Sequence, residues 1–320
     1  MTTQASRLAL VTGGARRVGR AICLALAQAG YDLILTWRTS RGEAEQTAGA
    51  CRAHGVSATV EPLDLNDLGA VEAFARRIAS AHDGLDLLVH NASLYERTLW
   101  GRIDARMAGD HLRINALAPL LLTQGLDAPL HKAHGLVVAM CDVQTLGRAR
   151  RRYAAYSMSK AALAEMVGTL AREMAPQVRV CGIAPGVVAW PPNTDPQEIE
   201  AYEARIPLQR PGTPEDVARL VLFLAREGTY ITGEIIRLDG GRSVTCRIST
   251  ARCMNDARRI LHRLAATHAS PLNSVARVAA KRLDRSPNRG APSSHPTPPA
   301  RAGCPSPALR RCAWPRPPVL

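Results

Sequence analysis

A tyrosine and a lysine four residues apart are the first side chains whose types and spacing could do chemistry. They are Tyr156 and Lys160, in the stretch "YAAYSMSKAAL". Residues at positions i and i+4 lie on one face of a helix, so the ammonium group would lie beside the phenol. A neighbouring cation favours the phenolate and lets the phenol exchange a proton near neutral pH. The pair therefore predicts a proton-transfer site, provided that a helix presents it to a pocket.

A carboxylate precedes this pair by fourteen residues. It is Asp142, in "MCDVQ", which follows an apolar run. Two interpretations are open at this point: Asp142 ends a strand as a turn former, or it joins the phenol in a site. The loop "LGRARRR" between them carries Arg148, Arg150, Arg151 and Arg152, which form either a solvated loop or a contact for an anionic substrate group.

Short runs rich in Val, Ile and Leu alternate with segments of helical periodicity, a pattern typical of a parallel sheet covered on both faces. The predicted strands are Leu8–Thr12, Asp32–Trp37, Ala58–Leu63, Leu85–His90, Gly135–Met140, Val178–Ile183 and Glu234–Leu238. The predicted helices are Arg17–Ala29, Ser40–Ala53, Asp67–Ala81, Asp104–Gly125, Ala154–Met174 and Pro214–Ala225, the last with Thr213 as its cap. This order predicts one doubly wound α/β domain over residues 1–246.

The first predicted strand leads into "VTGGARRVGR" and then a helix. Glycine lets the backbone approach a pyrophosphate, and a helix N-terminus offers free N–H groups to it. Gly13 and Gly19 keep this turn tight, although Arg16 and Arg17 place two long cations in it. The turn predicts a dinucleotide site.

The end of the second strand indicates which dinucleotide is bound. An acid there would bond a ribose 2′-hydroxyl, whereas Arg38, Thr39 and Ser40 stand in its place and would accept a 2′-phosphate. Arg16 or Arg17 could reach the same phosphate. NADPH is therefore expected; the alternative is that Arg38 and Ser40 only form a polar helix start.

Ligands bind at the carboxyl ends of strands in such sheets, so the residues after the next two strands complete the expected cofactor site. Asp64 is expected to accept from the adenine amino group and Leu65 to cover the ring. Asn91, Ala92 and Ser93, in "HNAS", would line the floor of the cleft, and the adjacent His90 is expected to be a packed strand-end residue.

The motifs "TGGARRVG", "HNAS", "RINALAP", "YSMSK" and "IAPG" resemble those of the short-chain dehydrogenase/reductase superfamily over residues 6–244. The resemblance implies a Rossmann-like fold and a homotetramer. It also implies that Tyr156 donates a proton, Lys160 assists it and holds the nicotinamide ribose, Asn115 supports a proton relay, and Pro185 and Gly186 lie beside the nicotinamide.

Two positions are similar to the pteridine reductases and dihydromonapterin reductases within that superfamily. Arg17 stands where glycine is commoner, and Asp142 stands where serine is usual. In that group the arginine contacts both cofactor phosphate and pterin, the aspartate joins the tyrosine and lysine, and "HNASLYERT" resembles the segment that supplies an aromatic stacking platform, here Tyr95. Trp190, in the loop after Gly186, is a candidate cover for the pterin.

Together these arguments predict an NADPH-dependent reductase of a dihydropterin C=N bond. The alternatives are a carbonyl reductase such as a 3-oxoacyl-carrier-protein reductase, and a polyanion binder that uses a basic tail. The predicted cofactor residues are Gly13, Arg16, Arg17, Val18, Gly19, Arg38, Thr39, Ser40, Asp64, Leu65, Asn91, Ala92, Ser93, Tyr156, Lys160, Pro185 and Gly186. The predicted substrate residues are Arg17, Ser93, Tyr95, Asp142, Tyr156 and Trp190.

Charge is distributed unevenly along the 320 residues, whose net charge is +14. Residues 247–320 hold 14 Lys and Arg against two acids, whereas residues 1–246 hold 27 basic and 25 acidic residues. The same tail holds 11 of the 22 prolines, a composition that predicts a largely disordered extension. Neither the eight cysteines nor the N-terminal residues suggest a metal site, disulfides or a targeting segment, so a cytoplasmic protein that does not contact membranes is expected.

Overall fold

A computed structural model describes residues 7–146, 151–190 and 194–244. Contacts between residues separate Met1–Cys246 from Arg247–Leu320, and the second range lies outside the described residues. The predictions for the basic tail, and for Arg148 and Arg150, lie outside the described residues.

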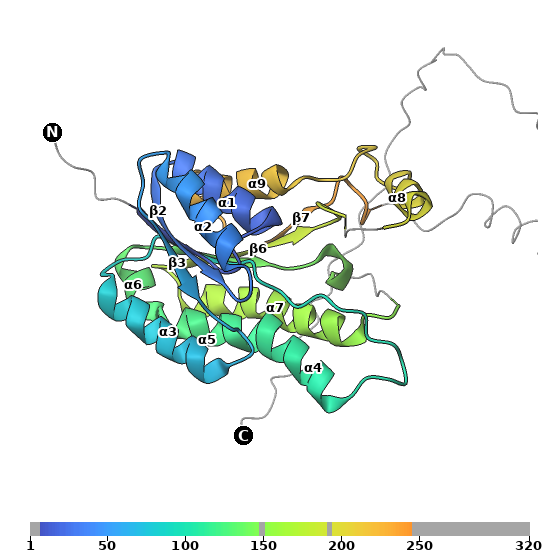
Figure 1. Cartoon of the computed structure of the whole chain (residues 1–320), viewed down its shortest axis with the longest axis horizontal. Coiled ribbons are helices and arrows are strands. Elements are labelled where there is room, and N and C mark those ends of the chain that lie inside the picture. Colours follow the sequence, from blue (N-terminus) through green and yellow to red (C-terminus); the bar gives the residue numbers. More distant parts are fainter. Residues whose placement is uncertain (1–6, 147–150, 191–193, 245–320) are drawn as a thin grey trace, which may run out of the picture. The chain divides into compact units, whose positions relative to one another are not determined.

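Seven strands form one parallel sheet in the order β3-β2-β1-β4-β5-β6-β7, which confirms the predicted fold class (Figure 1). The strands are β1 (Arg7–Val11), β2 (Tyr31–Trp37), β3 (Ala58–Pro62), β4 (Leu87–His90), β5 (Leu136–Met140), β6 (Arg179–Pro185) and β7 (Ile235–Leu238). The order reverses between β1 and β4, and a crevice at the carboxyl ends of the strands is where such sheets bind ligands.

Helices cover both faces of the sheet (Figure 1). Helices α1 (Arg17–Gln28), α2 (Arg41–Arg52) and α9 (Pro214–Arg226) lie on one face. The other carries α3 (Leu68–Ala81), α4 (Ala105–Leu112), α5 (Ala118–Gly125), α6 (Asp127–Lys132) and α7 (Ala154–Glu173). The predicted cap of α9 is confirmed, because Thr213 and Asp216 form a capping box ahead of Pro214.

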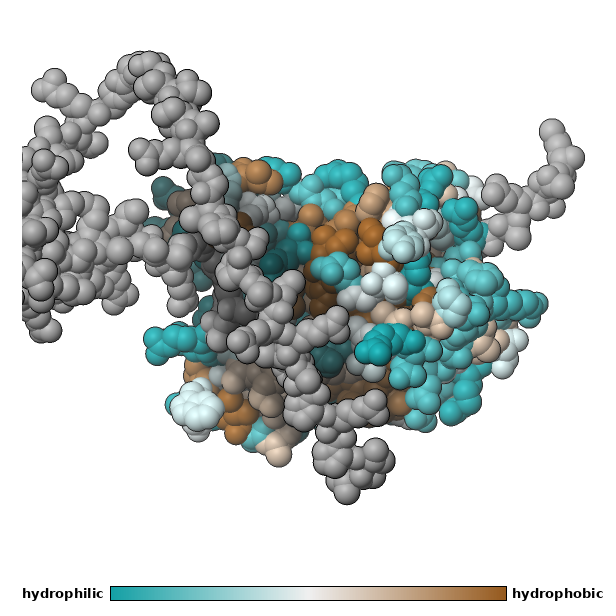
Figure 2. Space-filling view, turned by 180° about the vertical axis from the view of Figure 1, so that it is seen from behind, coloured by the Kyte–Doolittle hydropathy of each residue, from teal (hydrophilic) through white to brown (hydrophobic). Residues whose placement is uncertain are grey.

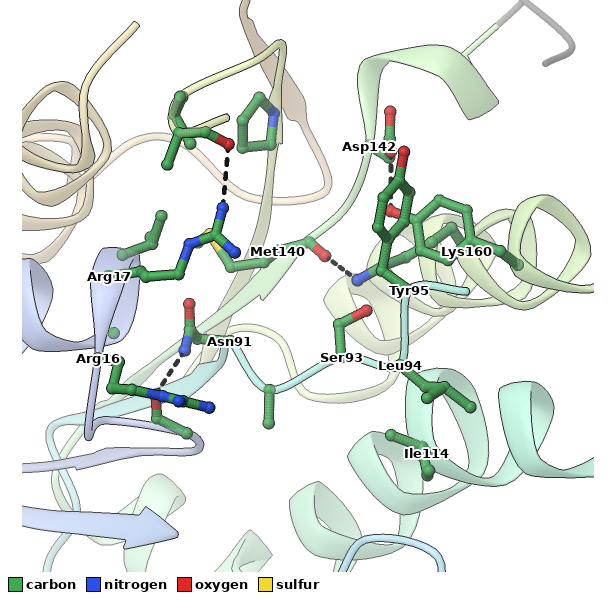
Figure 3. A pocket seen from close by; sticks show the side chains of 18 of the residues that line it. Arg16, Arg17, Asn91, Ser93, Leu94, Tyr95, Ile114, Met140, Asp142 and Lys160 are labelled. Atoms are coloured by element: carbon green, nitrogen blue, oxygen red, sulfur yellow. Dashed lines mark hydrogen bonds between the residues drawn. The ribbon is translucent and has the colours of Figure 1, made fainter. Parts of the chain in front are cut away.

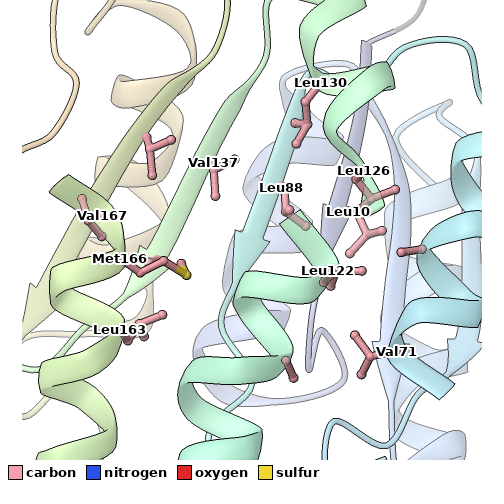
Figure 4. Close-up of a cluster of buried hydrophobic side chains, with 14 of the residues drawn as sticks. Leu10, Val71, Leu88, Leu122, Leu126, Leu130, Val137, Leu163, Met166 and Val167 are labelled. Atoms are coloured by element: carbon pink, nitrogen blue, oxygen red, sulfur yellow. The ribbon is translucent and has the colours of Figure 1, made fainter. Parts of the chain in front are cut away.

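Alternation along each central strand supplies both halves of the core. Side chains point to opposite faces at successive positions, so Leu10, Leu88 and Val137 pack against α3, α5 and α7, as Figure 4 shows. Their neighbours Val11 and Val89 face the α1, α2 and α9 side. Because both faces are covered, the strands are apolar throughout rather than alternately polar.

The predicted helix over Asp104–Gly125 is confirmed in its extent, but it is not a regular α-helix throughout. The structure has α4, then a π-helical turn, η1 (Arg113–Leu117), and then α5. The extra residue of a π turn re-aims the side chains within it, and such turns are frequent at functional sites. The sequence reading also missed α6 and α8 (Pro196–Glu203), where only a loop was expected.

On the face drawn in Figure 2, polar residues cover most of the surface formed by the described residues, and apolar residues gather in smaller patches between them. Exposed large apolar side chains include Leu117, Leu120 and Met158, from η1, α5 and α7. The described part contains no helix that is long and apolar enough to cross a membrane.

Candidate active site

A pocket of about 890 Å³ lies where the polar residues after the strands converge. Every residue predicted to touch cofactor or substrate lines it. Asn115 does not line it but bonds to residues at its wall. The pocket therefore brings together residues that the sequence spreads from Gly13 to Trp190.

Close backbone contacts shape the turn between β1 and α1. Gly13 has a φ of +66°, and a Cβ on Gly19 would lie 2.1 Å from the carbonyl oxygen of Gly13. The Asn91 amide donates to the carbonyl oxygens of Thr12 and Gly13 at 2.9 and 3.1 Å. No side chain fits at Gly19, so backbone N–H groups at the start of α1 stay open to a ligand.

The two arginines of this turn point in different directions (Figure 3). Arg16 forms an ion pair at 3.7 Å with Glu43 of α2, the helix that follows Arg38, Thr39 and Ser40. Arg17 donates to the carbonyl oxygen of Ala189 at 3.0 Å, in the loop after β6. Of the two arginines, Arg16 is thus the one directed toward the start of α2, next to the end of β2.

Arg17 adopts a φ of +50°, a left-handed conformation that favours glycine. The strain costs about 1 kcal/mol or more, and such residues cluster at functional sites. Glycine would adopt this backbone conformation without strain, yet the chain has an arginine here.

The end of β2 presents polar groups to the pocket. Arg38, Thr39 and Ser40 line it, and the Ser40 side chain makes no capping bond to α2. A helix start alone therefore does not explain Ser40. Asp64 and Leu65 line the pocket as well, with the Asp64 carboxylate accepting from the Asn66 N–H at 2.9 Å.

Asp142 and Tyr156 are in direct contact at the other end of the pocket. The phenol of Tyr156 donates to Oδ2 of Asp142 at 2.8 Å, and Oδ1 accepts from the Gln144 N–H at 2.7 Å. Asp142 is therefore both the turn former and a partner of the phenol, and the two interpretations of the sequence are compatible. The fourteen-residue spacing leaves the carboxylate within reach.

Lys160 is one helical turn beyond Tyr156 on α7 and is 3% exposed. Its ammonium group donates to the carbonyl oxygen of Met140 at 2.6 Å (Figure 3). Burial lowers the pKa of Lys160, and the nearby Cys141 and Asp142 act in the opposite direction. This partner fixes the buried ammonium in place on the helix that also carries Tyr156.

Asn115 lies in the π turn and uses both ends of its amide. Its Nδ2 donates to the carbonyl oxygen of Leu94 and to the Ser159 hydroxyl, both at 2.9 Å. Its Oδ1 accepts from Ser93 at 3.0 Å and from the Leu94 N–H at 2.8 Å. Asn115 in the π turn thus ties the loop after β4 to α7.

Three tyrosines form a wall beside Asp142. Tyr95 stacks on Tyr153 with ring centroids 5.0 Å apart and 19° between their planes, and it meets Tyr156 edge to face at 4.8 Å. Arg97 donates from Nε to the Tyr153 hydroxyl at 3.2 Å. Sequence reasoning missed Tyr153 and Arg97. The spacing of three residues between Tyr153 and Tyr156 could have pointed to Tyr153, because it places both on one face of a helix. No sequence pattern pointed to Arg97.

The loop after β6 forms the opposite wall. Pro185 and Gly186 line the pocket, and a Cβ on Gly186 would lie 3.1 Å from the Cβ of Asp239. Trp190 bonds through Nε1 to Glu203 of α8 at 3.3 Å and packs edge to face on Tyr202. Its indole is thereby attached to α8.

His90 is a packed residue behind the site. It is 3% exposed, and its Nε2 lies 2.8 Å from the Thr123 hydroxyl, which itself donates to the carbonyl oxygen of Pro119. Nε2 therefore carries the hydrogen. Burial, and after it the charge of Lys160, lower the pKa of His90 to about 3.

Several known proteins are similar to this chain. A family model described as Enoyl-(Acyl carrier protein) reductase matches residues 13–243. The 3-oxoacyl-(acyl-carrier-protein) reductase of Aquifex aeolicus is 34% identical over 253 residues, covering 73% of this chain and 96% of the relative. That of Synechocystis is 30% identical, covering 75% and 98%. The acetoin dehydrogenase structure from Salmonella typhimurium has a TM-score of 0.69 and 27% identity, covering 76% and 98%.

The parallel sheet, the glycine turn and the tyrosine–lysine pair define an oxidoreductase with a Rossmann-like fold. The chain belongs to the short-chain dehydrogenase/reductase superfamily. The donor set fits a nicotinamide dinucleotide, because the glycine cradle would be filled by a Cβ and cations flank it. Within the described ranges, no group of three His, Cys, Asp or Glu side chains could hold a metal ion.

Proposed function

We propose that the protein is an NADPH-dependent reductase that delivers hydride to the C=N bond of a dihydropterin, giving the tetrahydro form. The observation that carries this proposal is the hydrogen bond of 2.8 Å from Tyr156 to the Asp142 carboxylate. A carbonyl reductase needs a neutral donor at this position to polarise C=O. Reduction of C=N puts a proton on nitrogen, and a carboxyl group beside the phenol can take part in that transfer.

NADPH supplies the hydride when it is bound. The chain's own residues do the rest: Tyr156 and Asp142 hold the proton that goes to the ring nitrogen, and Lys160 stabilises the phenolate that forms. Asn115 ties the loop after β4 to α7, which keeps these groups in register. Burial and the hydrogen bond to Met140 hold the Lys160 side chain in place for this role.

The preference for NADPH rests on charge at the end of β2. Arg38 and Arg16 flank Thr39 and Ser40 in the pocket, a set that suits a phosphate. Asp64, Leu65, Asn91 and Ala92 would hold the adenine and the ribose. Pro185 and Gly186 would lie beside the nicotinamide.

A flat substrate suits the catalytic end. Tyr95 and Tyr153 stack on each other, and a pterin would stack beside this pair of rings. Stacking on an aromatic ring contributes about 0.5–1.5 kcal/mol beyond burial. Arg17 and Ser93 would bond the polar edge of the heterocycle, and Trp190 would cover it.

A second candidate is a 3-oxoacyl-carrier-protein reductase, because two of the relatives described above carry that name. In either case the partner is a small molecule.

A homotetramer is the proposed assembly, and exposed apolar residues such as Leu117 and Met158 would be covered in it. A role for the tail in polyanion binding remains the non-enzymatic alternative; it would weaken steeply with salt.

Steady-state oxidation of NADPH tests the proposal. The assay compares dihydrobiopterin, dihydromonapterin and dihydrofolate with an acetoacetyl thioester. The same substrates are then tested with NADH in place of NADPH. We expect turnover of at least one dihydropterin and preference for NADPH. In Asp142→Ser, pterin turnover should fall about 10²-fold or more while thioester turnover rises, since serine restores a neutral donor. Turnover of the thioester alone by the wild type would overturn the proposal in favour of the second candidate.

A further inference from the structure

Arg97 lies at the substrate end of the pocket, in the segment between β4 and α4. It lines the pocket beside Tyr95 and Tyr153, and its side chain is exposed. Arg16 and Arg38, the cations proposed to bind the cofactor phosphate, lie in the turn before α1 and after β2. Arg97 lies in another segment and has no proposed role in cofactor binding.

The guanidinium of Arg97 is held in one place. Its Nε donates to the Tyr153 hydroxyl at 3.2 Å, and Tyr153 stacks on Tyr95, which contacts Tyr156 edge to face. A guanidinium that is already positioned loses less side-chain entropy when it binds a ligand. Its two terminal nitrogens form a planar fork that matches carboxylate and phosphate oxygens.

Arg97 differs in its pairing from arginines such as Arg77 and Arg210. Arg77 bonds Glu61 at 2.8 Å and Arg210 bonds Asp216 at 2.9 Å. Among the described residues no carboxylate forms an ion pair with Arg97, although Glu198 of α8 attracts it from the far wall of the pocket. Its terminal nitrogens are therefore available to an anion at the pocket mouth.

A second arginine, Arg152, lies in the segment that pairs with the one carrying Arg97. The Thr98 N–H donates to the carbonyl oxygen of Arg152 at 2.8 Å, and Thr98 pairs with Tyr153 in a β-bridge. Arg152 is exposed and does not line the pocket. The bridge thus brings together basic residues from two segments that are distant in the sequence, and of the two only Arg97 lines the pocket.

We infer that Arg97 is a specificity residue that binds an anionic group on the part of the substrate that extends out of the pocket. The inference rests on the proposed function for the direction in which the substrate lies. A dihydropterin with a carboxylate-bearing tail, such as dihydrofolate, would be favoured over one with a neutral diol tail. If the substrate is a thioester, the anion would be a phosphate of its carrier group.

The test compares Arg97→Leu with the wild type on dihydrofolate and on dihydrobiopterin, with NADPH in each case. We expect kcat/KM for dihydrofolate to fall about tenfold, the value for one lost charge-assisted hydrogen bond, and that for dihydrobiopterin to stay within about twofold. Higher salt should reduce the wild-type value for dihydrofolate and have less effect on the variant. Arg102→Leu, which removes an exposed arginine outside the pocket, is the matched control.

Equal losses on both substrates, or no loss on either, would overturn the inference while leaving pterin reduction intact. If the wild type reduces neither pterin, the proposed function fails and the comparison passes to acetoacetyl-CoA and its uncharged N-acetylcysteamine analogue. Binding of folate and of biopterin to the NADPH complex, followed by tryptophan fluorescence, makes the same comparison without turnover. There, equal affinities of variant and wild type for folate would overturn the inference.

Discussion

The phosphate end and the catalytic end of the pocket are built in different ways. The phosphate end depends on the backbone: Gly13 and Gly19 leave no space for side chains, and Asn91 bonds the turn's carbonyl groups. The catalytic end depends on side chains from distant segments, joined by the bonds of Tyr156 to Asp142 and of Asn115 to Ser159. We therefore expect substitutions at the phosphate end to weaken cofactor binding, and substitutions at the catalytic end to lower kcat.

The two ends also differ in how selective their binding is expected to be. A glycine cradle at a helix N-terminus binds any pyrophosphate, since backbone N–H groups carry no information about the rest of the ligand. The choice of substrate falls to Asp142, Arg97 and the tyrosine wall. Arg17 connects the two ends, because it starts in the cradle and reaches the carbonyl oxygen of Ala189.

The largest effect is expected from Tyr156→Phe. The change keeps the ring that contacts Tyr95 but removes the hydroxyl that bonds Asp142. We expect kcat to fall about 10²- to 10⁴-fold, the usual contribution of a general acid, while the affinity for NADPH stays within about twofold. Stopped-flow turnover and cofactor titration measure the two quantities. Tyr230→Phe, at a fully exposed position outside the pocket, should change neither.

A phenylalanine variant that kept most of its activity would show that another group delivers the proton. Asp142 would then be the first to examine, through the same assay on Asp142→Asn. Loss of cofactor affinity in Tyr156→Phe would instead contradict the separation between the two ends.

The opposite pattern is expected from Gly19→Ala. The new Cβ would lie 2.1 Å from the Gly13 carbonyl oxygen and 2.7 Å from the Asn91 amide, so the turn must open. We expect NADPH affinity to fall more than about tenfold and the free energy of unfolding to drop by about 1–3 kcal/mol, as for other overpacked positions. Calorimetric titration and urea unfolding measure these changes.

Gly49→Ala is the control for that change. A Cβ there has nothing within 4 Å, and the position lies inside α2, where alanine is favoured by about 0.5–1 kcal/mol. Equal loss of affinity in both variants would show that the cradle at Gly19 is not what holds the cofactor.

The two ends also differ in how far the sequence predicted them. The seven strands and the cradle could be predicted because short apolar runs, helical periodicity and a glycine turn are local signals. Asp142 could be named, but its contact with Tyr156 depends on the path of the chain between them. Tyr153 and Arg97 were missed, since their bond joins residues 56 positions apart. The π turn that contains Asn115 was missed because it changes the period by one residue only.

The smallest effect on turnover is expected behind both ends, at His90. Its folded-state pKa of about 3 lies below the ordinary 6.5, so below pH 6.5 the unfolded chain binds more protons than the folded protein. The stability associated with neutral His90 is full above pH 6.5 and is lost as the pH falls toward 3, by about 1.4 kcal/mol per pH unit.

His90→Gln keeps a donor for Thr123 but does not titrate. Urea unfolding between pH 7.5 and 4.5 should therefore show a shallower loss of stability in the variant, with kcat at pH 7.5 within about threefold of the wild type because the imidazole is already neutral there. Parallel curves for the two proteins would show that His90 is not the group that acid titrates.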